Sequence, residues 1–308
     1  MRAFIFPGQG SQAVGMGAAL AEASRSARDV FDEVDEALGQ NLFKLMREGP
    51  DEDLKLTENA QPAIMAHSIA VLRTMGIQLA DVARFAAGHS LGEYSALCAA
   101  GSFDLATTAK LLKLRGQAMQ QAVPVGQGAM AALLGADLTL AQKIADAAAE
   151  GEVCTVANDN DPSQVVISGS KAAIDRAIAL AKDLGAKRAV PLPVSAPFHC
   201  PLMQPAAEAM RDALSYVVVG KPAVPIFANV SAQPETDPDI IRNQLVDQVT
   251  GMVRWRESVS NMFDAGAHQF VEIGGKVLGS MIKRIVPDAR VTSVVTIEDV
   301  EALAKEIS

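Results

Sequence analysis

The sequence has 308 residues, about half of them apolar, and a formal net charge of −9. This length and apolar content allow a large core and two globular units, while the acidic balance argues against general nucleic-acid binding. No stretch approaches the roughly 20 consecutive apolar residues of a membrane helix, so we expect a soluble, cytoplasmic protein without a membrane span.

The first predicted element is a short buried strand at residues 4–6, followed by a glycine-rich loop, Pro-Gly-Gln-Gly-Ser-Gln, at 7–12. Such a loop can place backbone N–H groups at a ligand, or it can be an ordinary turn. It lacks both the lysine of a P-loop and the spacing of a dinucleotide fingerprint. Three segments with apolar residues at helical spacing come next, at residues 18–24, 27–38 and 63–75.

An apolar segment at 82–87 runs into Gly-His-Ser-Leu-Gly at 88–92, and an alanine-rich segment follows to residue 100. We interpret this as a strand, a sharp turn and a helix, with Ser90 at the turn. The arrangement is that of a G-x-S-x-G nucleophile turn, in which helix amides lie beside the hydroxyl. A glycine-serine loop that merely caps a helix is the alternative.

A mostly apolar helix is predicted to follow Ser102, with Ser102 as its N-cap and Asp104 in its first turn. Arg115 lies inside this helix. Its guanidinium is suited to holding a carboxylate in a two-pronged contact, or its side chain can simply reach to solvent from an apolar surface.

Residues 126–194 contain a compact β-α-β-β-α-β pattern, which predicts a ferredoxin-like insert. The Asn-Asp-Asn-Asp-Pro cluster at 158–162 lies between its two middle strands and is predicted to be a loop, with a substrate contact as a further hypothesis. The predicted strands and helices of this insert are at residues 129–134, 140–149, 153–157, 164–168, 172–184 and 186–192.

His199 follows the insert in a proline-flanked segment. The chain has only four histidines. His67 is expected to be a packed core residue, the His89 side chain should leave the sharp turn in another direction, and His268 lies just before a predicted strand. His199 is therefore the best candidate for a general base. Cys200 beside it belongs to a set of three widely spaced cysteines, which predicts neither a disulfide framework nor a metal site.

The last third returns to alternating strands and helices, with predicted strands at 226–230, 269–274 and 291–295. A carboxylate that orients His199 is not obvious from the sequence. Four acidic residues could each do so in a hydrolase-like triad, or could be surface charges and helix caps: Asp239, Asp247, Asp264 and Glu272.

Four motifs in this order closely resemble the malonyl-CoA:acyl-carrier-protein transacylase family of bacterial fatty-acid synthesis: the 7–12 loop, the 88–93 turn, Leu-Arg-Gly at 114–116, and Ser-Ala-Pro-Phe-His at 195–199. The resemblance covers essentially the whole chain. It implies an α/β hydrolase-like core with a mainly parallel sheet, formed by residues 1–125 and 195–308, and a ferredoxin-like subdomain at 126–194, with the active site between them.

The resemblance also implies roles for individual residues. Ser90 would be the nucleophile and His199 the base. The backbone amides of Gln9 and Leu91 would form the oxyanion hole, and Arg115 would bind the free malonyl carboxylate. The backbone carbonyl of Gln248 would orient His199, although Gly-Met at 251–252 stands where the family often has a proline.

The activity implied is malonyl transfer from malonyl-CoA to the phosphopantetheine thiol of holo acyl carrier protein, through a malonyl-serine intermediate, with no metal or redox cofactor. We expect a monomer. Phe198 resembles malonyl-selective members, in which a bulky ring limits α-branching, or it packs in the core. Because carrier proteins are also acidic, docking would need a local basic patch, for which Lys182, Lys187 and Arg188 are candidates. A serine esterase or thioesterase and a non-catalytic acyl-CoA-binding protein are the alternatives.

Overall fold

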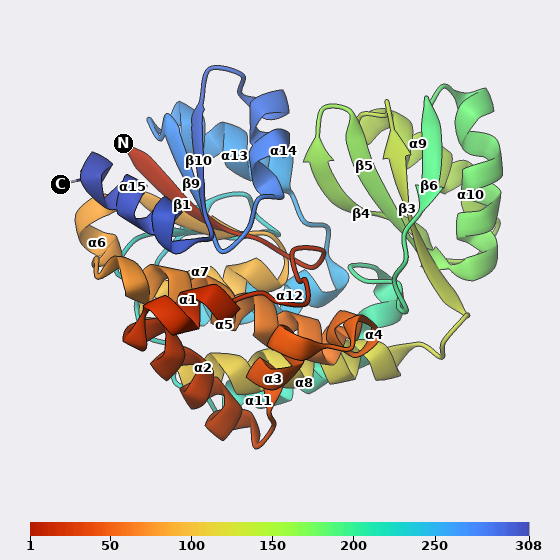
Figure 1. Ribbon diagram of the computed structural model, residues 1–308. Helices are drawn as coiled ribbons and strands as arrows, with labels where there is room; N and C mark the ends of the chain where they lie inside the picture. Colours follow the sequence, from red (N-terminus) through yellow and green to blue (C-terminus); the bar gives the residue numbers. More distant parts are fainter. Residues whose placement is uncertain (308) are drawn as a thin grey trace.

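A six-stranded sheet lies at the centre of the computed structural model, which describes residues 1–307 (Figure 1). Its strands are β1 (Arg2–Phe6), β2 (Phe85–Gly88), β7 (Ile226–Phe227), β8 (Pro234–Glu235), β9 (Gln269–Ile273) and β10 (Arg290–Val294). They are arranged in the order β10-β9-β1-β2-β7-β8. Five of them run parallel, and only β8 pairs antiparallel, at the edge. The predicted mainly parallel α/β fold is confirmed, although the strand expected at 226–230 has only two residues.

Helices cover both faces of this sheet (Figure 1). Those before residue 125 are α1 (Ala18–Ala23), α2 (Arg25–Leu38), α3 (Leu42–Glu48), α4 (Asp51–Lys55), α5 (Thr57–Met75), α6 (Leu79–Val82), α7 (Leu91–Ala99) and α8 (Leu105–Ala122). Those after residue 200 are η1 (Pro201–Met203), α11 (Gln204–Ser215), α12 (Pro238–Thr250), α13 (Trp255–Asp264), α14 (Leu278–Ile285) and α15 (Ile297–Ile307). Each helix within residues 1–307 is too short or too polar to cross a membrane.

Strand β1 shows how the sheet separates two cores. Side chains alternate between the faces of a strand. Phe4 and Phe6 therefore join the larger core with α2, α5, α7, α8 and α11. Ala3 and Ile5 join the smaller core with α13 and α14. Burial on both faces explains why the strand is continuously apolar rather than alternating with polar residues.

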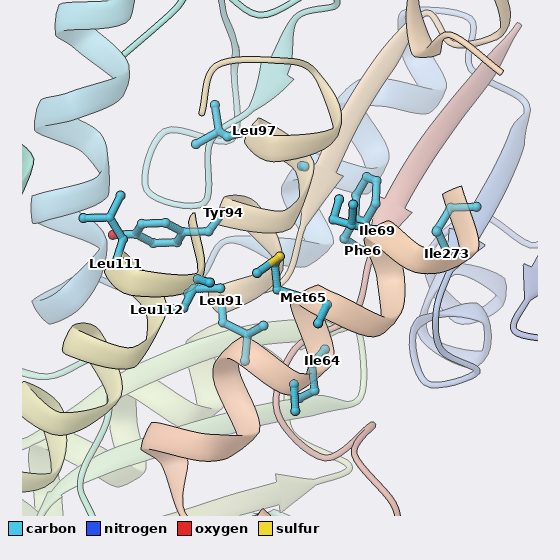
Figure 2. Close-up of a cluster of buried hydrophobic side chains, with 14 of the residues drawn as sticks. Phe6, Ile64, Met65, Ile69, Leu91, Tyr94, Leu97, Leu111, Leu112 and Ile273 are labelled. Atoms are coloured by element: carbon cyan, nitrogen blue, oxygen red, sulfur yellow. The ribbon is translucent and has the colours of Figure 1, made fainter. Parts of the chain in front are cut away.

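The larger core packs around α5, most of whose residues are buried. Figure 2 shows Ile64, Met65 and Ile69 of α5 gathered with Phe6 of β1 and Leu91 of α7. Since Leu91 directly follows Ser90, this packing fixes the start of α7 against the sheet and thereby fixes the turn that precedes it.

A second, four-stranded sheet lies to one side of the first (Figure 1). Its strands β3 (Gly128–Leu134), β4 (Cys154–Asp161), β5 (Gln164–Ser170) and β6 (Arg188–Pro191) are in the order β4-β5-β3-β6 and are all antiparallel. Helices α9 (Leu138–Ala149) and α10 (Lys171–Leu184) pack against Ala131 and Leu133 of β3. The predicted element order β-α-β-β-α-β is confirmed.

The prediction of a loop at 158–162 is wrong for residues 158–161, because β4 continues to Asp161, and only Pro162 of this cluster lies in the turn before β5. Two ion pairs explain why this acidic segment is extended and buried. Asp159 pairs with Arg256 of α13 at 2.8 Å, and Asp161, which is fully buried, pairs with Arg284 of α14 at 2.8 Å. Backbone bonds between β4 and Val253 lie beside them. These contacts hold the small sheet to the helices of the large one.

Replacement of Asp161 by alanine should lower the free energy of unfolding by about 1–3 kcal/mol, because it removes a fully buried carboxylate together with its bonds to Arg284 and Ser163. Asp161 Oδ1 also accepts bonds from Ser163 N and Oγ, both at 2.9 Å. Urea unfolding measures the change. Asp175→Ala is the matched control, since Asp175 pairs with Lys171 on an exposed face of α10 and should contribute less than about 1 kcal/mol. Equal losses for the two variants would contradict the assignment.

Candidate active site

Ser90 occupies the sharp turn between β2 and α7 and has a left-handed backbone, with φ of 54°. The two flanking glycines are required by close backbone approach. A Cβ on Gly88 would lie 1.9 Å from the backbone carbon of Gly92, and a Cβ on Gly92 would lie 2.3 Å from the Phe6 carbonyl oxygen. Larger residues at either position would force the turn apart. The strained turn is the geometry that exposes a nucleophilic hydroxyl.

The structure brings Ser90 and His199 together, although 109 positions separate them in the sequence. Ser90 Oγ lies 2.8 Å from His199 Nε2. On the other side of the ring, His199 Nδ1 lies 2.8 Å from the backbone carbonyl oxygen of Gln248. A carbonyl only accepts, so Nδ1 carries the proton and the lone pair of Nε2 faces the serine. This is the arrangement that a general base needs.

None of the four acidic residues considered from the sequence hydrogen bonds to His199 within the described chain. Glu272, for example, accepts bonds from the amides of Val277, Leu278 and Gly279, at 2.7, 3.0 and 3.1 Å, and so caps α14. The orienting group for His199 is a backbone carbonyl rather than a carboxylate.

The other histidines lie in different surroundings. His67 is buried in α5, with Nδ1 3.2 Å from the Gly274 carbonyl oxygen, as expected for a packed residue. The His89 ring turns away from the nucleophile, and its Nε2 lies 2.8 Å from Asn160 Oδ1 on β4. His268 stacks edge-on against Phe263. These positions are consistent with the choice of His199 over the other three histidines as the candidate base.

Burial, with the charge of Arg115 as a second cause, lowers the pKa of His199 from 6.5 to about 3. The ring should therefore stay neutral in the folded protein well below pH 6. Histidine ring NMR resonances, assigned with a His199→Gln variant, measure this directly. Protein unfolded in urea serves as the control and should titrate near the ordinary value of about 6.5.

The depressed pKa of His199 makes the free energy of unfolding depend on pH. Between pH 6.5 and about 3 the unfolded chain binds a proton at this residue that the folded chain excludes. His199 therefore lowers the free energy of unfolding as the pH falls through that range. A folded-state titration of His199 near pH 6.5 would contradict the assignment.

Arg115 of α8 is almost completely buried beside the serine. Its Nη1 donates to Gln61 Oε1 at 2.7 Å, and its Nη2 donates to Gln248 Oε1 at 2.8 Å and to Ser90 Oγ at 3.2 Å. Its Nε has no partner in the described chain. Burial lowers the pKa of the guanidinium, but arginine remains charged in proteins. The guanidinium is thus held at both terminal nitrogens, Nη1 and Nη2, next to the candidate nucleophile. In the described chain it has no direct carboxylate partner.

A cavity of about 470 Å³ opens over this group. Gln9 and Leu91 both line it, and within the described chain neither backbone amide donates to another group. Met119 and Met130 contribute apolar surface, and Phe198 lies in the wall. A polar reacting centre under an apolar channel is typical of a small-ligand site. Among residues 1–307, no cluster of three or more acidic, histidine or cysteine side chains is placed to hold a metal ion.

Three residues that hydrogen bond to the Ser90 turn or around Arg115 were not singled out from the sequence. Asn229, after β7, accepts the Ser90 amide at 2.8 Å and donates to the Gly88 carbonyl at 2.7 Å, so it fastens the turn on both sides. Gln61 and Glu93 hold the Arg115 fork directly or through Gln248. Only Glu93 carries a local signal, because it lies in the turn motif itself.

The model of the acyl transferase domain family matches residues 3–285. The chain is 46% identical over 285 residues to the malonyl CoA-acyl carrier protein transacylase of Escherichia coli K12, covering 92% of each chain. The corresponding protein of Bacillus subtilis is 45% identical and also aligns over 92% of this chain, covering 90% of its own length.

Solved structures agree. An acyl-carrier-protein S-malonyltransferase from Bartonella henselae is 51% identical, with a TM-score of 0.97 over 100% of this chain and 99% of its own. A malonyl-transacylase solved in complex with a type II PKS acyl-carrier protein is 40% identical, with a TM-score of 0.96 and 99% coverage of both chains. With the match to the family model, these similarities show that the chain belongs to the acyl transferase domain family, among the malonyl CoA-acyl carrier protein transacylases.

Proposed function

We propose that this protein transfers the malonyl group of malonyl-CoA to the phosphopantetheine thiol of holo acyl carrier protein, supplying malonyl units for fatty-acid synthesis. The observation that carries the proposal is the 2.8 Å contact between Ser90 Oγ and His199 Nε2 beside the buried guanidinium of Arg115. Family membership and the relative solved with its acyl-carrier protein support it.

In the first half-reaction, His199 Nε2 takes the proton of Ser90 as Oγ attacks the malonyl thioester carbon. The resulting oxyanion accepts bonds from the amides of Gln9 and Leu91, and losing one such donor typically costs about 3 kcal/mol of transition-state stabilisation. The carbon–sulfur bond breaks, and the CoA sulfur takes the proton from His199, so that CoA leaves as a thiol and the ring is neutral again. The Gln248 carbonyl keeps the ring oriented throughout.

In the second half-reaction, the thiol of the carrier protein gives its proton to His199 and attacks malonyl-Ser90. The carbon–oxygen bond to Ser90 breaks, and the hydroxyl is restored by the same proton. Arg115 holds the free carboxylate of the malonyl group in both halves, which favours malonyl over acetyl groups. Phe198 in the cavity wall would limit branching at the α-carbon. This chemistry needs no metal or redox cofactor.

We also infer the surroundings of the site. Residues 126–194 would form a ferredoxin-like subdomain inserted into an α/β hydrolase-like core of residues 1–125 and 195–308, an inference that the strand order β4-β5-β3-β6 supports. We expect a cytoplasmic monomer. Lys187 and Arg188 line a hollow together with Arg284, which supports a basic docking patch for an acidic carrier protein.

Intact-protein mass spectrometry after exposure to malonyl-CoA tests the proposal. The expected result is a malonyl adduct, mapped to Ser90, that is discharged by holo acyl carrier protein with formation of malonyl-carrier protein. Release of free malonate at the same rate without acceptor would instead identify a thioesterase. Absence of an adduct would identify a binding protein.

A further inference from the structure

Glu93 is a buried carboxylate one helical turn after Ser90, only 2% exposed. The order Ser-x-x-Glu at a helix start predicts a capping box, in which the glutamate accepts the amide of the first residue. The structure differs. The Ser90 amide donates to Asn229 Oδ1 at 2.8 Å instead, and its partner Asn229 comes from beyond β7. The Glu93 carboxylate therefore does not cap α7 and needs another explanation.

The Glu93 carboxylate lies on the far side of Gln248 from Arg115. Its Oε2 accepts from Gln248 Nε2 at 2.6 Å and from the Asn229 amide at 3.1 Å. The other end of the same side-chain amide, Gln248 Oε1, accepts from Arg115 Nη2 at 2.8 Å. One glutamine amide thus bridges a buried carboxylate and a buried guanidinium.

This bridge has a single orientation. If the Gln248 amide turned over, its NH₂ group would face the guanidinium, and its oxygen would face both the Glu93 carboxylate and the Ser90 carbonyl. The contact from Glu93 is the shortest that the amide makes. Burial raises the pKa of Glu93 to about 7, although the bonds from Gln248 and Asn229 oppose that rise.

We propose that Glu93 is a positioning residue for Arg115: through the side-chain amide of Gln248, its Oε2 atom fixes where the guanidinium meets the free carboxylate of the acyl group. The inference rests on the proposed malonyl transfer. Because Arg115 Nη1 is held independently by Gln61, Glu93 acts on the Nη2 side, the side that also reaches Ser90.

Two conservative variants separate the effect of the length of the Glu93 side chain from the effect of its charge. Glu93→Asp keeps the charge but is one methylene shorter, so it cannot hold Gln248 and Asn229 as Oε2 does. Glu93→Gln loses the charge but keeps an oxygen at that reach. Both hydrogen bonds go to the same oxygen, Oε2, so a glutamine can accept both and place its NH₂ group where no donor contacts the carboxylate.

The experiment measures how fast Ser90 is loaded by malonyl-CoA and by acetyl-CoA, over a range of concentrations, using intact mass. Glu93→Asp should lower the second-order rate constant with malonyl-CoA by about tenfold or more, because a small displacement of a binding group lowers the rate strongly. Most of this loss should come from a higher malonyl-CoA concentration at half-maximal loading. The rate of this variant with acetyl-CoA should stay within about threefold, and Glu93→Gln should keep the wild-type selectivity within about threefold.

The matched control is Glu272→Asp, which shortens an equally buried carboxylate that caps α14 and should leave the malonyl-to-acetyl ratio unchanged. An unchanged ratio in Glu93→Asp, or an equal loss in Glu93→Gln, would overturn the proposal. If Glu93→Asp does not fold, Gln248→Met cuts the same bridge without removing the backbone carbonyl, and an unchanged ratio there has the same force. Failure of the proposed function is distinct, since wild-type protein would then either form no malonyl-Ser90 or release its malonyl group to water instead of to carrier protein.

Discussion

Replacing Ser90 by alanine should abolish the malonyl adduct and lower transfer to carrier protein by about 10⁴-fold or more, the usual scale for loss of a covalent nucleophile. The hydroxyl is the only group that the structure places both 2.8 Å from His199 and 3.2 Å from Arg115 in the described chain. Without it, His199 has no proton to accept and no acyl-enzyme forms. Radiolabelled malonyl transfer and intact mass measure the two losses.

Ser95→Ala is the matched control, because Ser95 lies on the same helix and its buried hydroxyl has no partner in residues 1–307. That variant should load and transfer at close to the wild-type rate. An adduct persisting in Ser90→Ala would place the nucleophile elsewhere and overturn the assignment of the turn.

Replacing Arg115 by alanine should lower malonyl loading by about 10²–10³-fold, because each hydrogen bond to a charged group typically contributes about 1.5–3 kcal/mol. Acetyl-CoA has no free carboxylate, so its loading should fall much less, and the gap between the two donors should narrow. Arg115→Lys should not restore selectivity, since an ammonium group cannot reproduce the fork that Gln61 and Gln248 hold.

Lys113→Ala controls for loss of a positive charge on the same helix. Lys113 pairs with Glu58 at 3.1 Å, away from Ser90, and its removal should leave the malonyl-to-acetyl ratio unchanged. Unchanged selectivity in Arg115→Ala would refute the role of Arg115 in holding a carboxylate. Competition by free malonate, but not by acetate, against loading of the wild-type protein gives an independent measurement of the same contact.

Local features of the sequence predicted the turn at Ser90 well, because its determinants are local: an apolar strand, two glycines with no room for a Cβ, and a following helix. The N-cap of α8 was predicted less well. The helix begins one residue after Asp104, whose side chain accepts the Thr107 amide at 2.6 Å, so Asp104 rather than Ser102 is the cap.

Contacts between distant parts of the chain could not be predicted from local features of the sequence. The polar residues at 158–161 are typical of a loop, yet they pair with β5 as a strand, and Arg256 and Arg284, from far along the chain, pair with the two aspartates among them. Likewise, Asn229 and Gln61 have no neighbouring motif that would mark them, and their importance follows from where the sheet places them. The pairing of Ser90 with His199 was reached by elimination and by resemblance.

The pairing of β3 with β6 has an evolutionary consequence. Because Ala131 lies opposite Pro191, the chain leaves the large sheet and returns to it at one place, with both connections side by side. Because the two chain connections are adjacent, an insertion or deletion within this unit leaves the order of the six strands unchanged, provided that the ion pairs of β4 with α13 and α14 are kept. The small sheet can therefore change the residues that it contributes to the cavity, such as Met130 and Val166, while the turn at Ser90 stays in place.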